Sequence, residues 1–158
     1  MKIQVLKIGR PAHGAYSELS DMFFKRLKGV WKIEETIVKA HASEERAGQE
    51  IFSKLGWSAS GQRQDPQHLI VALDERGKEL TSPALAAFLQ EKIDSSFVKQ
   101  LTFVIGGPYG LHESVRRQAD FCLCLSKGVF PSDMAWIMLW EQLYRASTIL
   151  RGTGYHHE

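Results

Sequence analysis

The chain has 158 residues, 44% of them hydrophobic and 24% charged, which is typical of a single globular domain spanning residues 1–158. Its formal net charge of +2 permits a local basic patch but does not by itself indicate nucleic-acid binding. No apolar run is long enough to cross a membrane, and the opening MKIQVLKIG lacks the features of a secretion signal. We therefore expect a cytoplasmic protein with no membrane partner.

The two cysteines, Cys122 and Cys124, stand two residues apart in the stretch FCLCL. A structural zinc site needs four ligands at suitable spacing, and the sequence has no second cysteine pair. We expect no metal site, and we interpret the two cysteines as small apolar side chains on one face of a strand.

Strand and helix patterns alternate along the whole chain. Alternating or continuous apolar residues predict strands at 2–9, 31–40, 68–75, 101–105 and 121–126. Apolar residues at helical spacing predict helices at 16–29, 43–56, 81–93, 114–119 and 132–150, followed by a short tail at 151–158. This alternation predicts an α/β fold with a mostly parallel sheet and helices on both of its faces.

A glycine-rich turn joins the fourth strand to the next helix in FVIGGPYGLHESV, residues 103–115. A phosphate-binding P-loop would need Gly-Lys followed by Ser or Thr, and this turn has no lysine. The dinucleotide fingerprint follows a first strand and needs a glycine where Pro108 stands. Two interpretations remain: a ligand site at the carboxyl end of a central strand, or a tight connection that binds nothing.

Four segments together resemble one family: FVIGGPYGL, LSKGVFP, WEQLYRASTI and the terminal GYHHE, in that order. They are similar to the RlmH family, ribosomal RNA large subunit methyltransferase H, of the SPOUT class, and the resemblance covers the whole chain. It implies a deep trefoil knot in the C-terminal half, S-adenosyl-L-methionine as cofactor, and a homodimer. The implied reaction is N3-methylation of a pseudouridine in helix 69 of 23S rRNA, on the assembled 70S ribosome.

The resemblance also implies roles for individual residues. Arg145, Tyr155 and His156 match catalytic positions, with His156 as the candidate base and His157 and Glu158 as weaker ones. The alternative for these residues is a frayed terminus, and for Arg145 a helical ion pair with Glu141. The positions that match cofactor contacts are Leu73, Gly106, Gly107, Leu125, Ser126, Lys127, Gly128, Val129 and Phe130.

The chain departs from the family pattern at three places. Ser132 follows Pro131 where the family has His, Trp136 stands where it has Arg, and Gly128-Val129 replaces a Met-Thr or Leu-Thr step. We expect cofactor binding to survive, since that loop acts mainly through its backbone, and we expect Trp136 to add apolar area to a dimer interface. The departures at Ser132 and Trp136 keep a second function open, a non-catalytic ribosome- or RNA-binding protein of the same fold.

Overall fold

A computed structural model describes residues 1–156, apart from the side chain of Glu44, so His157 and Glu158 lie outside the described residues. Five strands form one sheet in the order β2-β1-β4-β3-β5, and every neighbouring pair is parallel. The strands are β1 (Lys2–Ile8), β2 (Lys32–Val38), β3 (His68–Glu79), β4 (Gln100–Ile105) and β5 (Phe121–Cys124). The predicted parallel sheet is confirmed, and its order is compatible with the knot that the resemblance implies.

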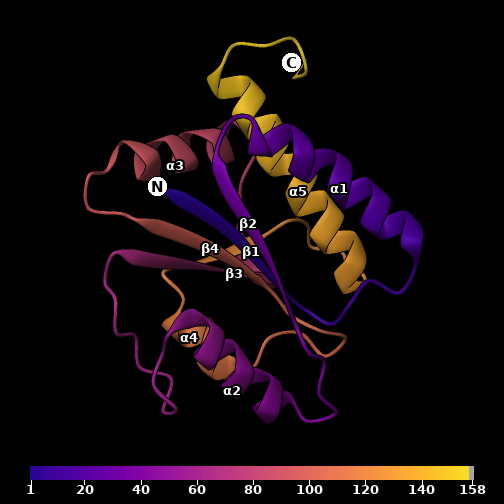
Figure 1. Cartoon of the computed structure of the whole chain (residues 1–158), viewed down its shortest axis with the longest axis vertical. Helices are drawn as coiled ribbons and strands as arrows, with labels where there is room; N and C mark the ends of the chain where they lie inside the picture. Colours follow the sequence, from indigo (N-terminus) through magenta and orange to yellow (C-terminus); the bar gives the residue numbers. More distant parts are fainter. Residues whose placement is uncertain (157–158) are drawn as a thin grey trace.

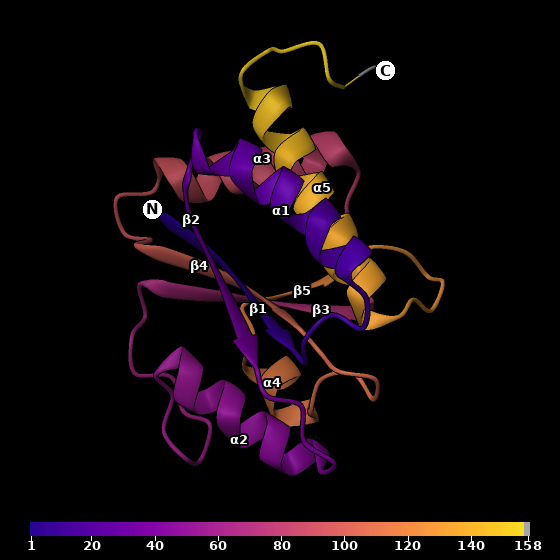
Figure 2. The ribbon, with the colours of Figure 1, turned by 45° about the vertical axis from the view of Figure 1, so that its right-hand side comes forward.

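The helices lie on both faces of this sheet, as predicted (Figure 1). They are α1 (Gly14–Lys28), α2 (Glu44–Leu55), α3 (Ser82–Asp94), α4 (Glu113–Gln118) and α5 (Ser132–Leu150). Figure 2 shows α1, α3 and α5 together on one face, and α2 with α4 on the other. Local signals fix their ends: the Thr81 side chain caps α3, and Gly56 ends α2 in the left-handed region at φ 70°.

Two hydrophobic cores share the sheet because successive side chains of a strand point to opposite faces. Ile3 and Val5 belong to the core under α1, α3 and α5, whereas Leu6 and Ile8 belong to the core under α2 and α4. All four side chains are buried. The nearly continuous apolar runs of the central strands thus reflect a sheet that is covered on both sides.

The third strand differs from its prediction, since β3 continues to Glu79 instead of ending at residue 75. Its register with β5 shifts between Leu73 and Lys78, so the intervening residues leave the regular ladder. Gly77 passes close to β5 there: a Cβ on it would lie 2.5 Å from the carbonyl oxygen of Cys122. The charged sequence DERGK resembles a turn, and it is only pairing with β5 that continues the strand.

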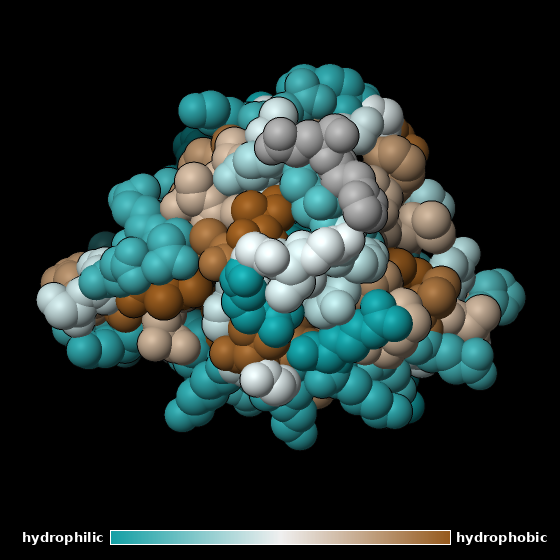
Figure 3. All heavy atoms as spheres, turned by 90° about the horizontal axis from the view of Figure 1, so that it is seen from above, coloured by the Kyte–Doolittle hydropathy of each residue, from teal (hydrophilic) through white to brown (hydrophobic). Residues whose placement is uncertain are grey.

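The two tryptophans of α5 are inside the molecule. Trp136 is 2% exposed and Trp140 0% exposed, and their indole N–H groups donate to Oε1 of Glu35 at 3.1 and 3.2 Å. The expectation that Trp136 adds apolar area to a dimer interface is therefore wrong, because its ring packs into the chain's own core. Seen from the end where the tail lies, apolar side chains still reach the surface among hydrophilic ones (Figure 3). At the other end of α5, Met134 is 37% exposed.

Candidate functional site

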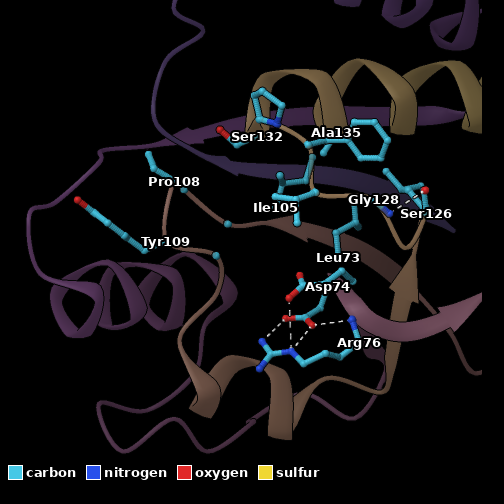
Figure 4. Close-up of a pocket in the computed structure, with 18 of the residues that line it drawn as sticks. Leu73, Asp74, Arg76, Ile105, Pro108, Tyr109, Ser126, Gly128, Ser132 and Ala135 are labelled. Atoms are coloured by element: carbon cyan, nitrogen blue, oxygen red, sulfur yellow. Dashed lines mark hydrogen bonds and ion pairs between the residues drawn. The ribbon is translucent and has the colours of Figure 1, made fainter.

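A cavity of about 350 Å³ lies at the carboxyl ends of β3, β4 and β5. This is the edge at which open parallel sheets bind ligands, and the volume is sufficient for a small organic molecule. Figure 4 shows Ser132 and Ala135 on one side, Asp74 and Arg76 on the opposite side, and Pro108 and Gly128 on the flanks. Three separate connections of the chain therefore build one pocket.

The first wall is the turn Gly107–Gly110 after β4. The N–H of Gly110 donates to the carbonyl of Gly107 at 2.9 Å, with Pro108 at the second position of the turn and Gly110 at φ 81°. A Cβ on Gly106 would lie 2.5 Å from the carbonyl oxygen of Gly110. Gly106 is thus required by the closure of the turn itself, and a side chain there would displace the turn before it met any ligand.

The second wall is the irregular segment of β3. Asp74, whose side chain is 5% exposed, accepts from Nε and Nη2 of Arg76 at 2.7 and 2.9 Å and lies 3.5 Å from Nε of Arg116. The hydrogen bonds from Arg76 lower the pKa of Asp74 and outweigh the opposite effect of its burial. A carboxylate is therefore held ionised beside the cavity.

The third wall is formed by the segment after β5 and the first turn of α5. The buried ammonium of Lys7 lies 2.8 Å from Oδ1 of Asp133, whose other oxygen accepts from the N–H of Ala12 at 2.9 Å. Burial acts to raise the pKa of Asp133, but the bonds from Ala12 and Lys7 together hold it below its ordinary value. This ion pair fixes the start of the helix from which Ser132 and Ala135 line the cavity.

The structure brings nearly all of the expected cofactor positions together. Lys127 is the exception: its Nζ contacts the carbonyls of Glu75 and Gly77 at 3.3 and 3.4 Å and so braces the irregular segment of β3. The other expected positions line the cavity: Leu73, Gly106, Gly107, Leu125, Ser126, Gly128, Val129 and Phe130. Sequence reasoning missed Asp74, Arg76, Pro108 and Tyr109 as lining residues, although the charged step directly after a buried strand was a usable signal.

The expected catalytic residues lie elsewhere in the same chain. Arg145 is ten residues beyond Ala135 on α5, which corresponds to about 15 Å along the helix axis. The Tyr155 ring packs against Tyr144 and under the Arg145 guanidinium, each 4.9 Å away, and its hydroxyl donates to Glu141 at 3.2 Å. Arg145 also forms the ion pair with Glu141 that was its alternative role.

The end of the tail is docked on α5. Burial, with the neighbouring Glu141 carboxylate, raises the pKa of Tyr155, so this phenol stays protonated at neutral pH. Nδ1 of His156 is buried and has no hydrogen-bond partner among the described residues. Among the side chains that the structure describes, no three His, Cys, Asp or Glu residues come together as a metal site. No helix of the described residues is long and apolar enough to cross a membrane.

Comparison with known proteins identifies the family. The family described as "Predicted SPOUT methyltransferase" matches residues 1–156. "Ribosomal RNA large subunit methyltransferase H" of Oleidesulfovibrio alaskensis is 37% identical over 98% of both chains. The chain belongs to the RlmH family of SPOUT methyltransferases. The protein of the same name from Flavobacterium johnsoniae is 35% identical over the full length of both, and that from Geobacter metallireducens is 51% identical over 56% of each.

A solved structure supports the fold independently of sequence. The probable methylase family protein from Haemophilus influenzae Rd KW20 aligns with 99% of this chain and 70% of its own, with a TM-score of 0.56 at 10% sequence identity. The α/β fold with a parallel sheet is therefore that of SPOUT methyltransferases.

Proposed function

We propose that this protein is a cytoplasmic rRNA methyltransferase that uses S-adenosyl-L-methionine and acts on N3 of a pseudouridine in helix 69 of 23S rRNA, in the assembled 70S ribosome. The observation that carries the proposal is the pocket at the ends of β3, β4 and β5, which gathers all but one of the positions expected to contact the cofactor. Relatives named as rRNA large subunit methyltransferases support the substrate class.

The residues of the pocket suit this cofactor. Leu73, Ile105 and Leu125 offer an apolar slot for an adenine ring, and the turn at Gly107–Gly110 allows close backbone approach. On the other side, the ionised Asp74 is paired with Arg76 and Arg116, which holds that wall of the pocket in place. When bound, the cofactor supplies an electrophilic methyl group on a sulfonium, and the chain's task is to hold it in line with the acceptor nitrogen.

We further propose that the working form is a homodimer, with each site made by two chains. Arg145 and the docked Tyr155 lie about 15 Å along α5 from the pocket of their own chain. In a dimer, a second copy would present its tail to this pocket. The exposed Val129, Phe130 and Met134 beside the pocket provide apolar surface for such a contact.

In this arrangement the tail would handle the uracil ring. The N3–H of the acceptor is weakly acidic, so a base that accepts its proton would accelerate transfer by roughly 10²–10⁴-fold. His156 is our candidate for that base, because its buried Nδ1 has no partner within the described part of the chain. The protonated Tyr155 would donate a hydrogen bond, and Arg145 would pair with a phosphate or with the cofactor carboxylate.

The direct test is methyl transfer from radiolabelled S-adenosyl-L-methionine to 70S ribosomes from a strain that lacks the modification. Mass spectrometry of the digested rRNA would locate the methyl group, and free 50S subunits would test the requirement for assembly. Calorimetry with the cofactor separates the second candidate function only in part, and the methyl-transfer assay separates it fully. A non-catalytic ribosome-binding protein would bind ribosomes and transfer no methyl group.

A mixing experiment tests the two-chain site. Gly106→Ala should impair the pocket, and a chain ending at Gly154 lacks the docked end of the tail. If each site uses the pocket of one chain and the tail of the other, a mixed dimer retains one intact site. With the cofactor held well below the concentration that saturates Gly106→Ala, refolding the two impaired proteins together should then restore about a quarter of normal activity. No restoration, with mixed dimers detected by mass, would contradict a shared site.

A further inference from the structure

The turn Gly107–Gly110 is a wall common to two cavities. On its other side lies a smaller cavity of about 30 Å³, lined by Ala40, His41 and His112. Tyr109 stands on this turn and is 80% exposed, and in Figure 4 its hydroxyl end points away from the main pocket. A large aromatic side chain held out on a tight turn beside a reaction site contributes little to the fold and is available to a partner.

Two cations emerge at the same edge of the sheet. β1 and β2 end side by side, with Ile8 opposite Val38, and a Cβ on Gly107 would lie 3.3 Å from Ile8. Lys39 follows β2 directly and Arg10 follows β1 after one glycine. Both are exposed, and neither forms an ion pair with a side chain that the structure describes. The carboxylate of Glu50 at this edge is already paired with His41.

We propose that Tyr109, Arg10 and Lys39 form a docking surface for single-stranded RNA next to the nucleotide that undergoes methylation. This inference rests on the proposed function, which makes RNA the substrate. Stacking on an exposed aromatic ring and phosphate pairing with Lys and Arg are how proteins hold unpaired nucleotides. Cations on neighbouring strand ends favour a polyanion over an apolar protein partner.

The aromatic ring and the two cations should contribute to RNA binding in different ways. Stacking of a base on Tyr109 should add an affinity that depends little on salt concentration. Pairing of Arg10 and Lys39 with phosphates displaces counterions, so their contribution to affinity should fall as the salt concentration rises. Tyr109→Ala should therefore weaken RNA binding by about 5- to 100-fold, while Tyr109→Phe keeps the ring and most of the affinity. Lys39→Ala should reduce the salt dependence of log K by about 0.7 to 1, because one phosphate is then no longer neutralised.

The chain offers a matched control on the same strand. Lys32 is exposed at the amino end of β2, six residues before Val38, and faces the opposite edge of the sheet. Lys32→Glu and Lys39→Glu change the net charge equally, so a general electrostatic effect would alter both proteins alike. A difference in RNA affinity between the two variants would show that the effect depends on where the charge lies.

The experiment measures binding of a fluorescein-labelled single-stranded RNA with the helix 69 loop sequence by anisotropy at several KCl concentrations, and KM for unmodified ribosomes. We expect Tyr109→Ala and Lys39→Glu to lose affinity and raise KM, with Lys32→Glu unchanged and cofactor affinity of Lys39→Glu unchanged. Equal behaviour of Lys39→Glu and Lys32→Glu, or no RNA binding by the unaltered protein, would overturn the docking surface. An effect of Tyr109→Ala on ribosomes but not on the RNA would also overturn it and indicate a ribosomal protein as the partner. Absence of methylation by the unaltered protein would instead contradict the proposed function.

Discussion

The ammonium of Lys7 lies 2.8 Å from Oδ1 of Asp133, and so ties the end of β1 to the first turn of α5. Lys7 is 1% exposed, and its ammonium also donates to the carbonyl of Gly9 at 2.8 Å. The pair joins residues far apart in sequence at a point next to the pocket. Removing one partner of a buried pair is costly because the other charge is left without compensation.

Lys7→Met should therefore lower the free energy of unfolding by about 3 kcal/mol, at the low end for buried pairs because Asp133 keeps its bond from Ala12. Lys2→Met is the matched control, since Lys2 pairs with Glu34 at the surface and should contribute less than about 1 kcal/mol. Urea denaturation followed by circular dichroism measures both. Equal losses in the two variants would mean that the buried pair contributes no more than a surface one.

The two adjacent glycines of the turn should differ sharply in tolerance. A Cβ on Gly106 would lie 2.5 Å from the Gly110 carbonyl oxygen, whereas one on Gly107 would lie 3.3 Å from Ile8, which can shift slightly. Overpacking against backbone costs about 1–3 kcal/mol, so Gly106→Ala should weaken cofactor binding by roughly 5- to 100-fold, and Gly107→Ala by only a few-fold. Calorimetry with S-adenosyl-L-methionine compares them. The reverse order of effects would refute this account of the turn.

The half-buried carboxyl of Glu35 predicts a dependence of stability on pH. Burial raises its pKa above the ordinary 4.5, although the indole N–H groups of Trp140 and Trp136 act in the opposite direction. The folded state then binds this proton more tightly than the unfolded chain, so the Glu35 contribution to the free energy of unfolding falls as pH rises from 4.5 through the raised pKa. Denaturation of Glu35→Gln and the unaltered protein across this range should show the variant gaining relative stability with rising pH. Parallel curves would exclude the effect.

Much of the fold could be predicted from the sequence because the local patterns and the tertiary structure agree. Apolar runs such as residues 101–105 can only be buried on both faces, which requires helices on two sides. The end of β3 could not be predicted from the sequence, since the segment around Gly77 joins the sheet through contact with β5 and not because its residues alternate as in a strand. The interior position of Trp136 also depends on a distant partner, Glu35, which the sequence of α5 does not reveal.

Part of the candidate site was likewise predictable from the sequence, and part was not. The glycine turn was identifiable from composition, and the resemblance supplied the segment after β5. Asp74 and Arg76 were missed although they stand close together directly after a buried strand, and the approach of Arg116 to Asp74 exists only in the folded chain. The separation of Tyr155 from the pocket follows from the length of α5 and its docking on that helix, neither of which a motif can report.

The last prediction concerns the tail, and it distinguishes a residue that anchors the tail on α5 from a residue that takes part in methyl transfer. Tyr155 contacts Tyr144, Arg145 and Glu141, so Tyr155→Phe removes one hydrogen bond and should cost no more than about 1 kcal/mol of stability. His156→Ala removes the buried Nδ1, which has no partner among the described residues, and should leave both stability and cofactor affinity nearly unchanged. If His156 accepts the N3 proton, its loss should lower the rate of methyl transfer by roughly 10²–10⁴-fold. That deficit should shrink as pH rises, because the acceptor nitrogen then ionises without help. Single-turnover methylation of unmodified ribosomes at several pH values measures this; a small, pH-independent deficit would assign His156 to positioning of the ring instead.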